Sequence, residues 1–216
     1  MTYTENIFVC LAAPLVIALF LIRGEIRRFI GFFIIGLLSC LLSGYVSSFI
    51  VAAAKSWYYS MTAAESMIRL TPVCEEIMKA MSVFFYVAVL RPKRTNIITV
   101  ALAVGLGFAT LENSSYILQN GASEFFVALV RGFASGAMHA VCAAILGYGL
   151  VLVHNRERIA FTGAFAALCA ATTFHGIYNL LVSAEGFWLA AGYALPTLAA
   201  AAVMMVIKYA ELRIKD

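Results

Sequence analysis

Two adjacent carboxylates and an ammonium group stand at the start of an apolar run, in Thr71-Pro72-Val73-Cys74-Glu75-Glu76-Ile77-Met78-Lys79. Glu75 and Glu76 precede Lys79 by four and three residues, so on a helix all three share one face. Each ionisable group in a membrane segment costs roughly 2.5–3.5 kcal/mol at the bilayer centre, and such groups pair, line a wet cavity or do chemistry. A structural interpretation is an ion pair that neutralises itself at the helix end, but one glutamate is enough to neutralise Lys79, and the second one is left over.

Later apolar runs carry further groups of the same kind. They are Glu112, four residues after Phe108; His139; and His175, one helical turn before Asn179. Each has a structural interpretation when taken singly: either histidine can be a hydrogen-bonded core residue, Asn179 can bridge two helices, and Glu112 can pair with Lys79 or Arg131. Taken together, three carboxylates and two imidazoles are groups that can activate water, and both types are zinc ligands.

Composition indicates what must position these groups. The chain has 216 residues, of which 63% are hydrophobic and 12% charged, and its mean hydropathy is +0.95. This predicts an all-α polytopic membrane helix bundle, because a transmembrane barrel would show short alternating segments. The net charge of +4 comes from loop lysines and arginines and does not indicate nucleic-acid binding. The five cysteines are interpreted as small buried apolar residues, with no disulfide framework and no metal-type spacing.

About seven transmembrane helices are predicted, at residues 6–22, 29–53, 72–90, 96–118, 126–153, 160–183 and 187–207. Eleven of the fifteen lysines and arginines fall on one side of the membrane under this assignment, in the first, third and fifth loops and after the last span. The positive-inside rule therefore predicts the N-terminus outside and the C-terminus in the cytoplasm.

The chain is expected to form one integral membrane domain, residues 1–216, with the motif-bearing core at about 72–183. The first apolar run has no basic region before it, so it is interpreted as a membrane helix and not as a cleaved signal. The second loop, 54–71, is the longest and is expected to carry interfacial aromatic residues (Trp57, Tyr58, Tyr59) and a short surface helix. Thr71 is expected to cap the third span, with Pro72 in its first turn.

Under this topology the polar groups reach similar depths. Glu112 lies about 9 Å and His175 about 12 Å below the outer ends of their helices. Arg131 is expected near the outer interface, with His139 two turns deeper on the same face as Ser135. Four spans thus place an ionisable group in the outer half of the membrane. Glycines beside these groups would let the helices approach closely (Gly105, Gly107, Gly132, Gly136, Gly176).

At these residues the sequence resembles the PrsW-type intramembrane proteases, within the superfamily that includes the CAAX-prenyl endopeptidases and bacteriocin-processing proteins. The matching motifs are Glu75-Glu76-x-x-Lys79, Phe108-x-x-x-Glu112, His139 and His175-x-x-x-Asn179. They occur in the order of the family over about half of the chain. Lysine in the first motif and glutamate in the second favour the PrsW branch over the prenyl-endopeptidase branch.

The resemblance implies hydrolysis of a peptide bond in a single-span membrane protein near its extracytoplasmic side, as in the first cut of an anti-sigma factor, and suggests a bacterial inner membrane. Glu75 is the candidate general base. Glu112, His139 and His175 are candidate ligands of zinc or another divalent metal, with Glu76 as a fourth ligand or a partner of one. Without metal, His175 and Asn179 could bind the oxyanion while Glu75 and Glu112 orient water. Lys79 and Phe108 are expected to support the site.

Two other classes of function stay open from the sequence. One is a non-enzymatic membrane scaffold, because the superfamily looks to include a scaffold subunit of gamma-secretase that lacks the paired glutamates; the presence of Glu75 and Glu76 here favours an enzyme. An ion-coupled transporter would also use buried carboxylates and histidines, but the chain shows no inverted repeat and no matching pair of broken helices. Substrate identity and oligomeric state are not determined by these patterns.

Overall fold

The computed structural model describes residues 4–21, 26–57, 62, 65–120, 124–154 and 157–213, and over these residues the chain is all-helical. Seven α-helices and one π-helical turn follow one another: α1 (Thr4–Leu21), α2 (Ile26–Trp57), η1 (Ser66–Leu70), α4 (Thr71–Leu90), α5 (Arg94–Asn120), α6 (Phe125–Val153), α7 (Glu157–Val182) and α8 (Phe187–Arg213). The seven α-helices correspond one for one to the seven predicted spans. Their ends differ from the prediction by a few residues, most at the end of α8.

Four of these helices are long and apolar enough to cross a membrane, namely α2, α5, α6 and α7. Helices α1 and α8 contain shorter apolar stretches, Thr4–Leu19 and Phe187–Ala202. The fold is therefore that of an integral membrane helix bundle. The number of seven crossings, the orientation of the termini and the single-domain boundaries stay predictions.

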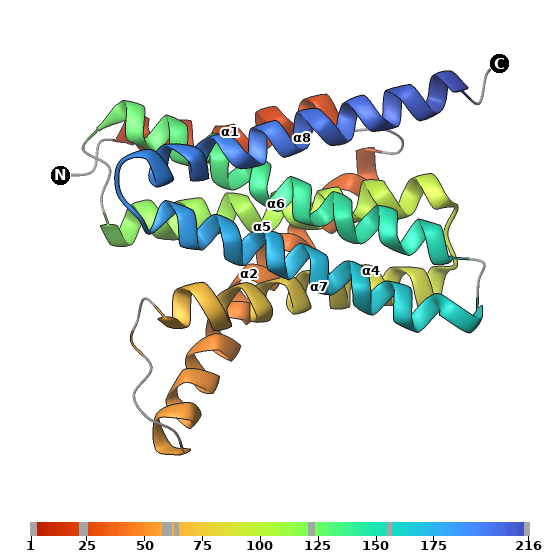
Figure 1. Ribbon diagram of the computed structural model, residues 1–216, viewed down its shortest axis with the longest axis horizontal. Coiled ribbons are helices and arrows are strands. Elements are labelled where there is room, and N and C mark those ends of the chain that lie inside the picture. Colours follow the sequence, from red (N-terminus) through yellow and green to blue (C-terminus); the bar gives the residue numbers. More distant parts are fainter. Residues whose placement is uncertain are drawn as a thin grey trace.

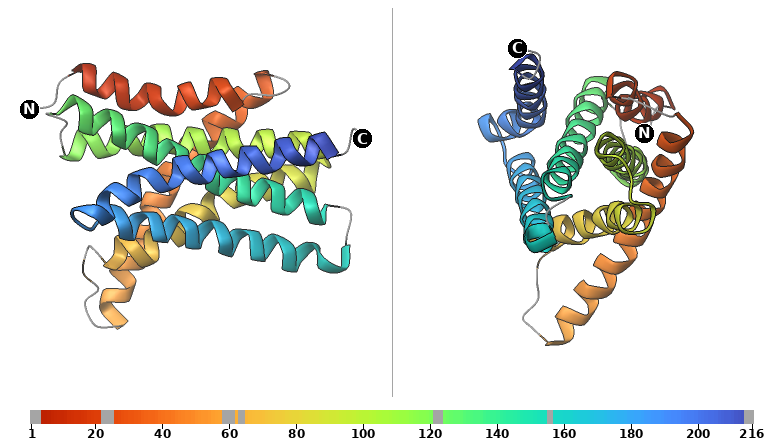
Figure 2. Two further views of the ribbon diagram at one scale, coloured as in Figure 1. Left: turned by 45° about the horizontal axis from the view of Figure 1, so that its top comes forward. Right: turned by 90° about the vertical axis from the view of Figure 1, so that its right-hand side faces the viewer.

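Helix α5 is the centre of the bundle. It packs against α1, α2, α4 and α6, and all of its residues from 99 to 110 are buried. A helix that is apolar on every side is stable only when other helices surround it. Figures 1 and 2 show α5 and α6 inside the bundle, with α7 and α8 along one flank. Because α5 and α6 are both enclosed, polar side chains on them are held away from lipid.

The contact between α5 and α6 depends on a glycine. A Cβ atom at Gly105 would lie 2.7 Å from the Cβ of Ala143 and 2.9 Å from the carbonyl oxygen of His139. Any side chain there would push the two helices apart. The prediction that Gly105 permits close helix packing is thus confirmed. One of the two close contacts is with the backbone of His139.

The start of α4 differs from the prediction. Thr71 does not cap the helix, because α4 already begins at Thr71 and its N-cap is Leu70, which makes no side-chain cap hydrogen bond. The N–H of Thr71 donates to the carbonyl oxygen of Ser66 in the preceding π-helical turn. The helical segment begins earlier: the backbone N–H and hydroxyl of Thr62 donate to the carboxylate of Glu65 at 3.0 and 3.1 Å, and the N–H of Glu65 donates to the Thr62 hydroxyl at 3.2 Å. This reciprocal capping box, which lies outside the predicted spans, lowers the pKa of Glu65.

In the second loop, where a short surface helix is expected, residues 58–61, 63 and 64 lie outside the described residues, and residues 66–70 form this π-helical turn. Pro72 has no N–H and cannot donate a helical hydrogen bond to the residue four positions before it. In the wider π-helical turn the N–H of Thr71 donates instead to Ser66, five positions before it. Turn η1 packs against α7 as well as α4. Tyr58 and Tyr59 lie outside the described residues, and α2 continues as far as Trp57. The second half of α2 leans away from the bundle in Figures 1 and 2, where Tyr45 and Phe49 are exposed.

Candidate active site

Four helices bring the predicted polar residues into one cluster. Glu75, Glu76 and Lys79 come from α4, Phe108 and Glu112 from α5, His139 from α6, and His175 and Asn179 from α7. Except for the half-buried Glu112 and Asn179, these residues are at most 8% exposed. The paired glutamates and Lys79 share the inner face of α4, as their spacing predicts. Residues 100 positions apart in the chain are thus neighbours in space.

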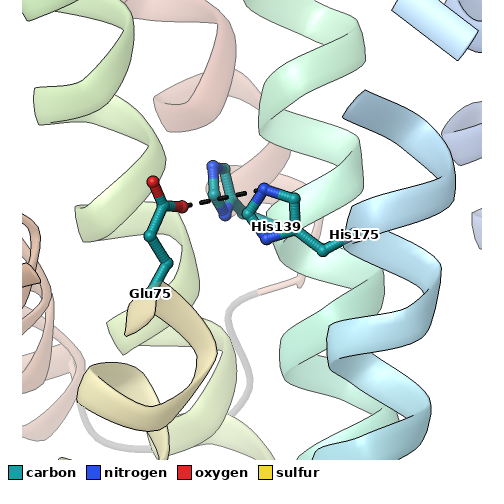
Figure 3. A group of neighbouring side chains, drawn as sticks. All are labelled: Glu75, His139 and His175. Carbon is teal, nitrogen blue, oxygen red and sulfur yellow. Dashed lines mark ion pairs between the residues drawn. The ribbon is translucent and has the colours of Figure 1, made fainter. Parts of the chain in front are cut away.

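Glu75, His139 and His175 form the middle of the cluster. Each offers a carboxylate oxygen or ring nitrogen, and the three atoms lie within 4.8 Å of one another. Figure 3 shows the Glu75 carboxylate facing the two imidazoles. The Nε2 atom of His175 is 3.7 Å from Oε2 of Glu75, and the two rings meet edge to face with centroids 5.2 Å apart. Oε2 of Glu75 has no hydrogen-bond partner among the described residues.

Glu76 faces a different set of partners from those of its neighbour. Its Oε1 accepts from Lys79 Nζ at 2.5 Å and contacts Nδ1 of His175 at 2.7 Å. A carboxylate on one ring nitrogen leaves the other nitrogen, Nε2, directed at Glu75 with its lone pair available. Glu76 therefore orients His175, so the two adjacent glutamates have distinct surroundings.

Lys79 connects this pair to the second histidine. Its ammonium group lies 2.9 Å from Nδ1 of His139 and 4.6 Å from the centre of the Phe108 ring. An ammonium group can only donate, so Nδ1 of His139 accepts and Nε2 carries the ring hydrogen. That nitrogen contacts a carboxylate oxygen of Glu112. The Phe108 ring also packs against His139, with ring centroids 5.2 Å apart.

Glu112 contacts Arg131 as well as His139. The second oxygen of Glu112 is 3.7 Å from the guanidinium of Arg131, which realises one of the two pairings open from the sequence. Arg131 also stacks on Tyr116, with its Cζ atom 3.3 Å from the ring centre. Asn179 lies one turn after His175 on α7, half buried. The cluster is therefore a continuous chain of charged and polar contacts from α4 to α6.

One further residue lies at the site that the sequence did not single out. Cys142 places its thiol within 4.8 Å of ligand atoms of Glu76 and His175, which makes a second group of possible metal ligands. It is one helical turn beyond His139 on α6, a spacing that could have indicated its position. All five cysteines are free; Cys10, Cys74 and Cys142 are buried as expected, whereas Cys40 is half-buried and Cys169 is exposed.

The donor set fits a divalent metal ion. Two imidazoles and the carboxylate of Glu75 converge, and Oε2 of Glu75 has no hydrogen-bond partner among the described residues. Glu112 contacts His139 but is not part of this close group. Imidazole nitrogen and carboxylate oxygen are ligands of zinc and of other first-row metals. Buried oxygens without partners are uncommon, and a bound ion or water is the usual explanation.

Fold and site together define a membrane-embedded protein with a carboxylate–imidazole centre able to activate water. A protein-family model described as PrsW family intramembrane metalloprotease matches residues 25–210. The chain belongs to this family and is an intramembrane metalloprotease, an integral membrane hydrolase that acts on a protein substrate in the membrane with a divalent metal. No curated protein and no solved structure matches the chain significantly.

Proposed function

We propose that this protease cuts a single-span membrane protein near its extracytoplasmic side, with Glu75 as general base. The observation that carries the proposal is the position of Glu75, whose unpartnered Oε2 faces both imidazoles. In this proposal Glu75 takes a proton from the attacking water and later passes it to the leaving amine. Glu76 is held by Lys79 and His175 and is not free to do so.

His139, His175 and Glu112 are the residues that would hold the metal, with Glu76 orienting His175 from behind. Nitrogen and oxygen ligands favour zinc among the divalent ions. The bound ion supplies a Lewis acid that polarises the substrate carbonyl and favours ionisation of water. A metal held through Nε2 of His139 would require the ring hydrogen to move from Nε2 to Nδ1, and Lys79, which now donates to Nδ1, would then donate to Glu76 alone.

The depth of the site supports the side on which the cut falls. The site residues lie near the N-terminal end of α4, in the C-terminal part of α5 and α7, and at the middle of α6, so most of them gather toward one end of the bundle. The basic loops predict that this end is external. An anti-sigma factor with one span is a substrate of the expected kind, and a bacterial inner membrane the expected location. Membership in the larger prenyl-endopeptidase superfamily is part of the same proposal.

Reconstitution with a fluorogenic single-span peptide tests the role of Glu75. We expect Glu75→Gln to lower the rate of cleavage by about 10²- to 10⁴-fold, the usual contribution of a general base, while the metal content stays near that of the unmodified protein. Undiminished cleavage by Glu75→Gln would remove the assignment. Glu185→Gln, in the exposed turn between α7 and α8, is the matched control and should cleave normally.

A version without metal chemistry is the second candidate mechanism. In it, His175 and Asn179 bind the oxyanion while Glu75 and Glu112 orient water. Chelation separates the two: loss of cleavage that returns on adding zinc supports the metal version, whereas chelator-resistant cleavage supports the other.

A further inference from the structure

Three polar side chains beside the site have atoms without hydrogen-bond partners among the described residues. The atoms are Nε of Arg131, Oγ of Ser135 and the hydroxyl oxygen of Tyr178. Ser135 is 1% exposed and Tyr178 3% exposed. Buried polar groups nearly always find a partner, because leaving one unpaired is costly. Three such groups in one neighbourhood therefore suggest a place where a ligand supplies the missing bonds.

The three groups lie at the same end of the site. Arg131 and Ser135 precede His139 by eight and four residues on α6, so all three share a face. Tyr178 follows His175 by three residues on α7, and its ring packs in the apolar cluster that contains Ala134 and Met138. Helices α6 and α7 follow one another in the chain and run antiparallel (Figure 1). Residues shortly before His139 on α6 therefore lie at about the same height in the bundle as residues shortly after His175 on α7.

Arg131 ties this group to the site. Its guanidinium is 3.7 Å from Glu112, which in turn contacts His139. Ser135 and Tyr178 each lie about one helical turn from a candidate metal ligand, His139 and His175 respectively. The unpartnered groups are thus next to the site, on the side toward the N-terminus of α6.

The charge balance indicates which ligand fits. Arg131 is already paired with Glu112 and stacked on Tyr116, so little positive charge is left to select a phosphate or a carboxylate. The other two groups are neutral hydroxyls. Together they present donors suited to a neutral acceptor, and a peptide carbonyl oxygen is such an acceptor. A substrate helix that unwinds for cleavage frees backbone carbonyls that need donors, because lipid offers none.

We propose that Arg131, Ser135 and Tyr178 form a substrate-backbone subsite, which binds a carbonyl oxygen of the unwound substrate segment next to the scissile bond. The subsite rests on the proposed function, since it assumes that the peptide is cut at the adjacent centre. Its members position the substrate and take no part in proton transfer. Binding of the carbonyl is expected to be equally strong before and during the reaction, so that loss of a hydroxyl weakens substrate binding and leaves turnover unchanged.

Binding to an inactive protein tests the subsite separately from catalysis. In a Glu75→Gln background, a dye-labelled single-span peptide of about 20 apolar residues with an extracytoplasmic extension is titrated in vesicles. We expect Ser135→Ala and Tyr178→Phe each to weaken binding by about 2- to 10-fold, the range for one net hydrogen bond. Tyr86→Phe, at a tyrosine that is also 3% exposed, and Ser39→Ala, at a serine that is 4% exposed, are the matched controls and should bind normally.

A second measurement separates a direct bond from a packing effect. Peptides with one backbone carbonyl oxygen replaced by sulfur, a poor acceptor, are compared across positions. At one position the replacement should weaken binding to the parent protein but not to Tyr178→Phe, which is the non-additivity expected of interacting groups. Equal effects at every position, or unaltered binding by both hydroxyl variants, or no binding of the peptide to the parent protein, would overturn the subsite. A failure of the proposed function gives a different result, namely undiminished cleavage by Glu75→Gln, so the two proposals are tested separately.

Discussion

A histidine is an effective metal ligand only when its other nitrogen is held, and at His175 this partner is the carboxylate of Glu76. The Nδ1 atom lies 2.7 Å from Oε1 of Glu76. That oxygen is itself fixed by Lys79 at 2.5 Å. The adjacent glutamate, Glu75, has no such partners on its Oε2 atom among the described residues. Two adjacent residues of the same type therefore have different surroundings.

At this scale we predict that Glu76→Gln weakens metal binding about 10- to 100-fold, as loss of a carboxylate partner of a ligand usually does. The neutral amide stabilises the ligating form of His175 less than a carboxylate does. Titration of the metal-free protein with zinc, followed by calorimetry, measures the effect. Glu185→Gln is the control, and a Glu76→Gln protein with unaltered zinc affinity would contradict the orienting role.

At the scale of helices, the site depends on how closely α5 and α6 approach. The Gly105 Cα faces Ala143 and the backbone of His139, so the distance between these helices sets the position of the His139 ring relative to Glu112. Helix α4 also helps to position the site. It is preceded by the π-helical turn η1, which follows the Thr62–Glu65 capping box. Local features far from the reacting groups thus determine their geometry.

We predict that Gly105→Ala lowers the stability of the protein by about 1–3 kcal/mol, the usual cost of overpacking, and also reduces cleavage. Gly44→Ala is the matched control, because a Cβ atom there meets nothing within 4 Å. Since alanine is the better helix former, the control should be neutral or slightly stabilising. Thermal unfolding in detergent measures both, and equal melting temperatures for the two variants would contradict the close-packing argument.

At the scale of the whole molecule, the orientation in the membrane decides which substrates reach the site. The helices form one bundle (Figure 2). The start of α4 and the C-terminal parts of α5 and α7, which carry most of the site residues, lie at the same end as the N-terminus of α6. Exposed apolar side chains line the outside of α2 and α8, as expected for surfaces in lipid. The basic loops predict that the site end is external.

Labelling of single cysteines tests this orientation. We predict that Glu185→Cys, in the exposed turn between α7 and α8, reacts with a membrane-impermeant maleimide added outside cells. Arg91→Cys, in the exposed loop after α4, should react only after the membrane is opened, because the positive-inside rule places that loop in the cytoplasm. The unmodified chain controls for the native cysteines. The reverse pattern would invert the topology and place the site on the cytoplasmic side.

Hydrophobic runs and the basic residues between them were sufficient to predict seven helices, since length and apolarity are local properties that a membrane helix must have. The order of the motifs was likewise sufficient to predict that Glu75, Glu76, Glu112, His139 and His175 gather, whereas the role of Asn179 stays a prediction. The helix start at the capping box was missed, although Thr62 and Glu65 have its spacing. The proximity of Cys142 to Glu76 and His175 was also missed, because a lone cysteine in an apolar run usually indicates packing.

The sequence by itself determined the kind of molecule: a helical membrane protein whose buried ionisable residues must meet, because isolated charges in lipid are too costly. Only the tertiary structure decided how they meet. Which glutamate holds His175 and which is left open, that Glu112 pairs with Arg131 and not Lys79, and that Ser135 and Tyr178 lack partners among the described residues all depend on the distance and rotation between packed helices. Those quantities arise from side-chain packing across the whole bundle, and no spacing along one helix contains them.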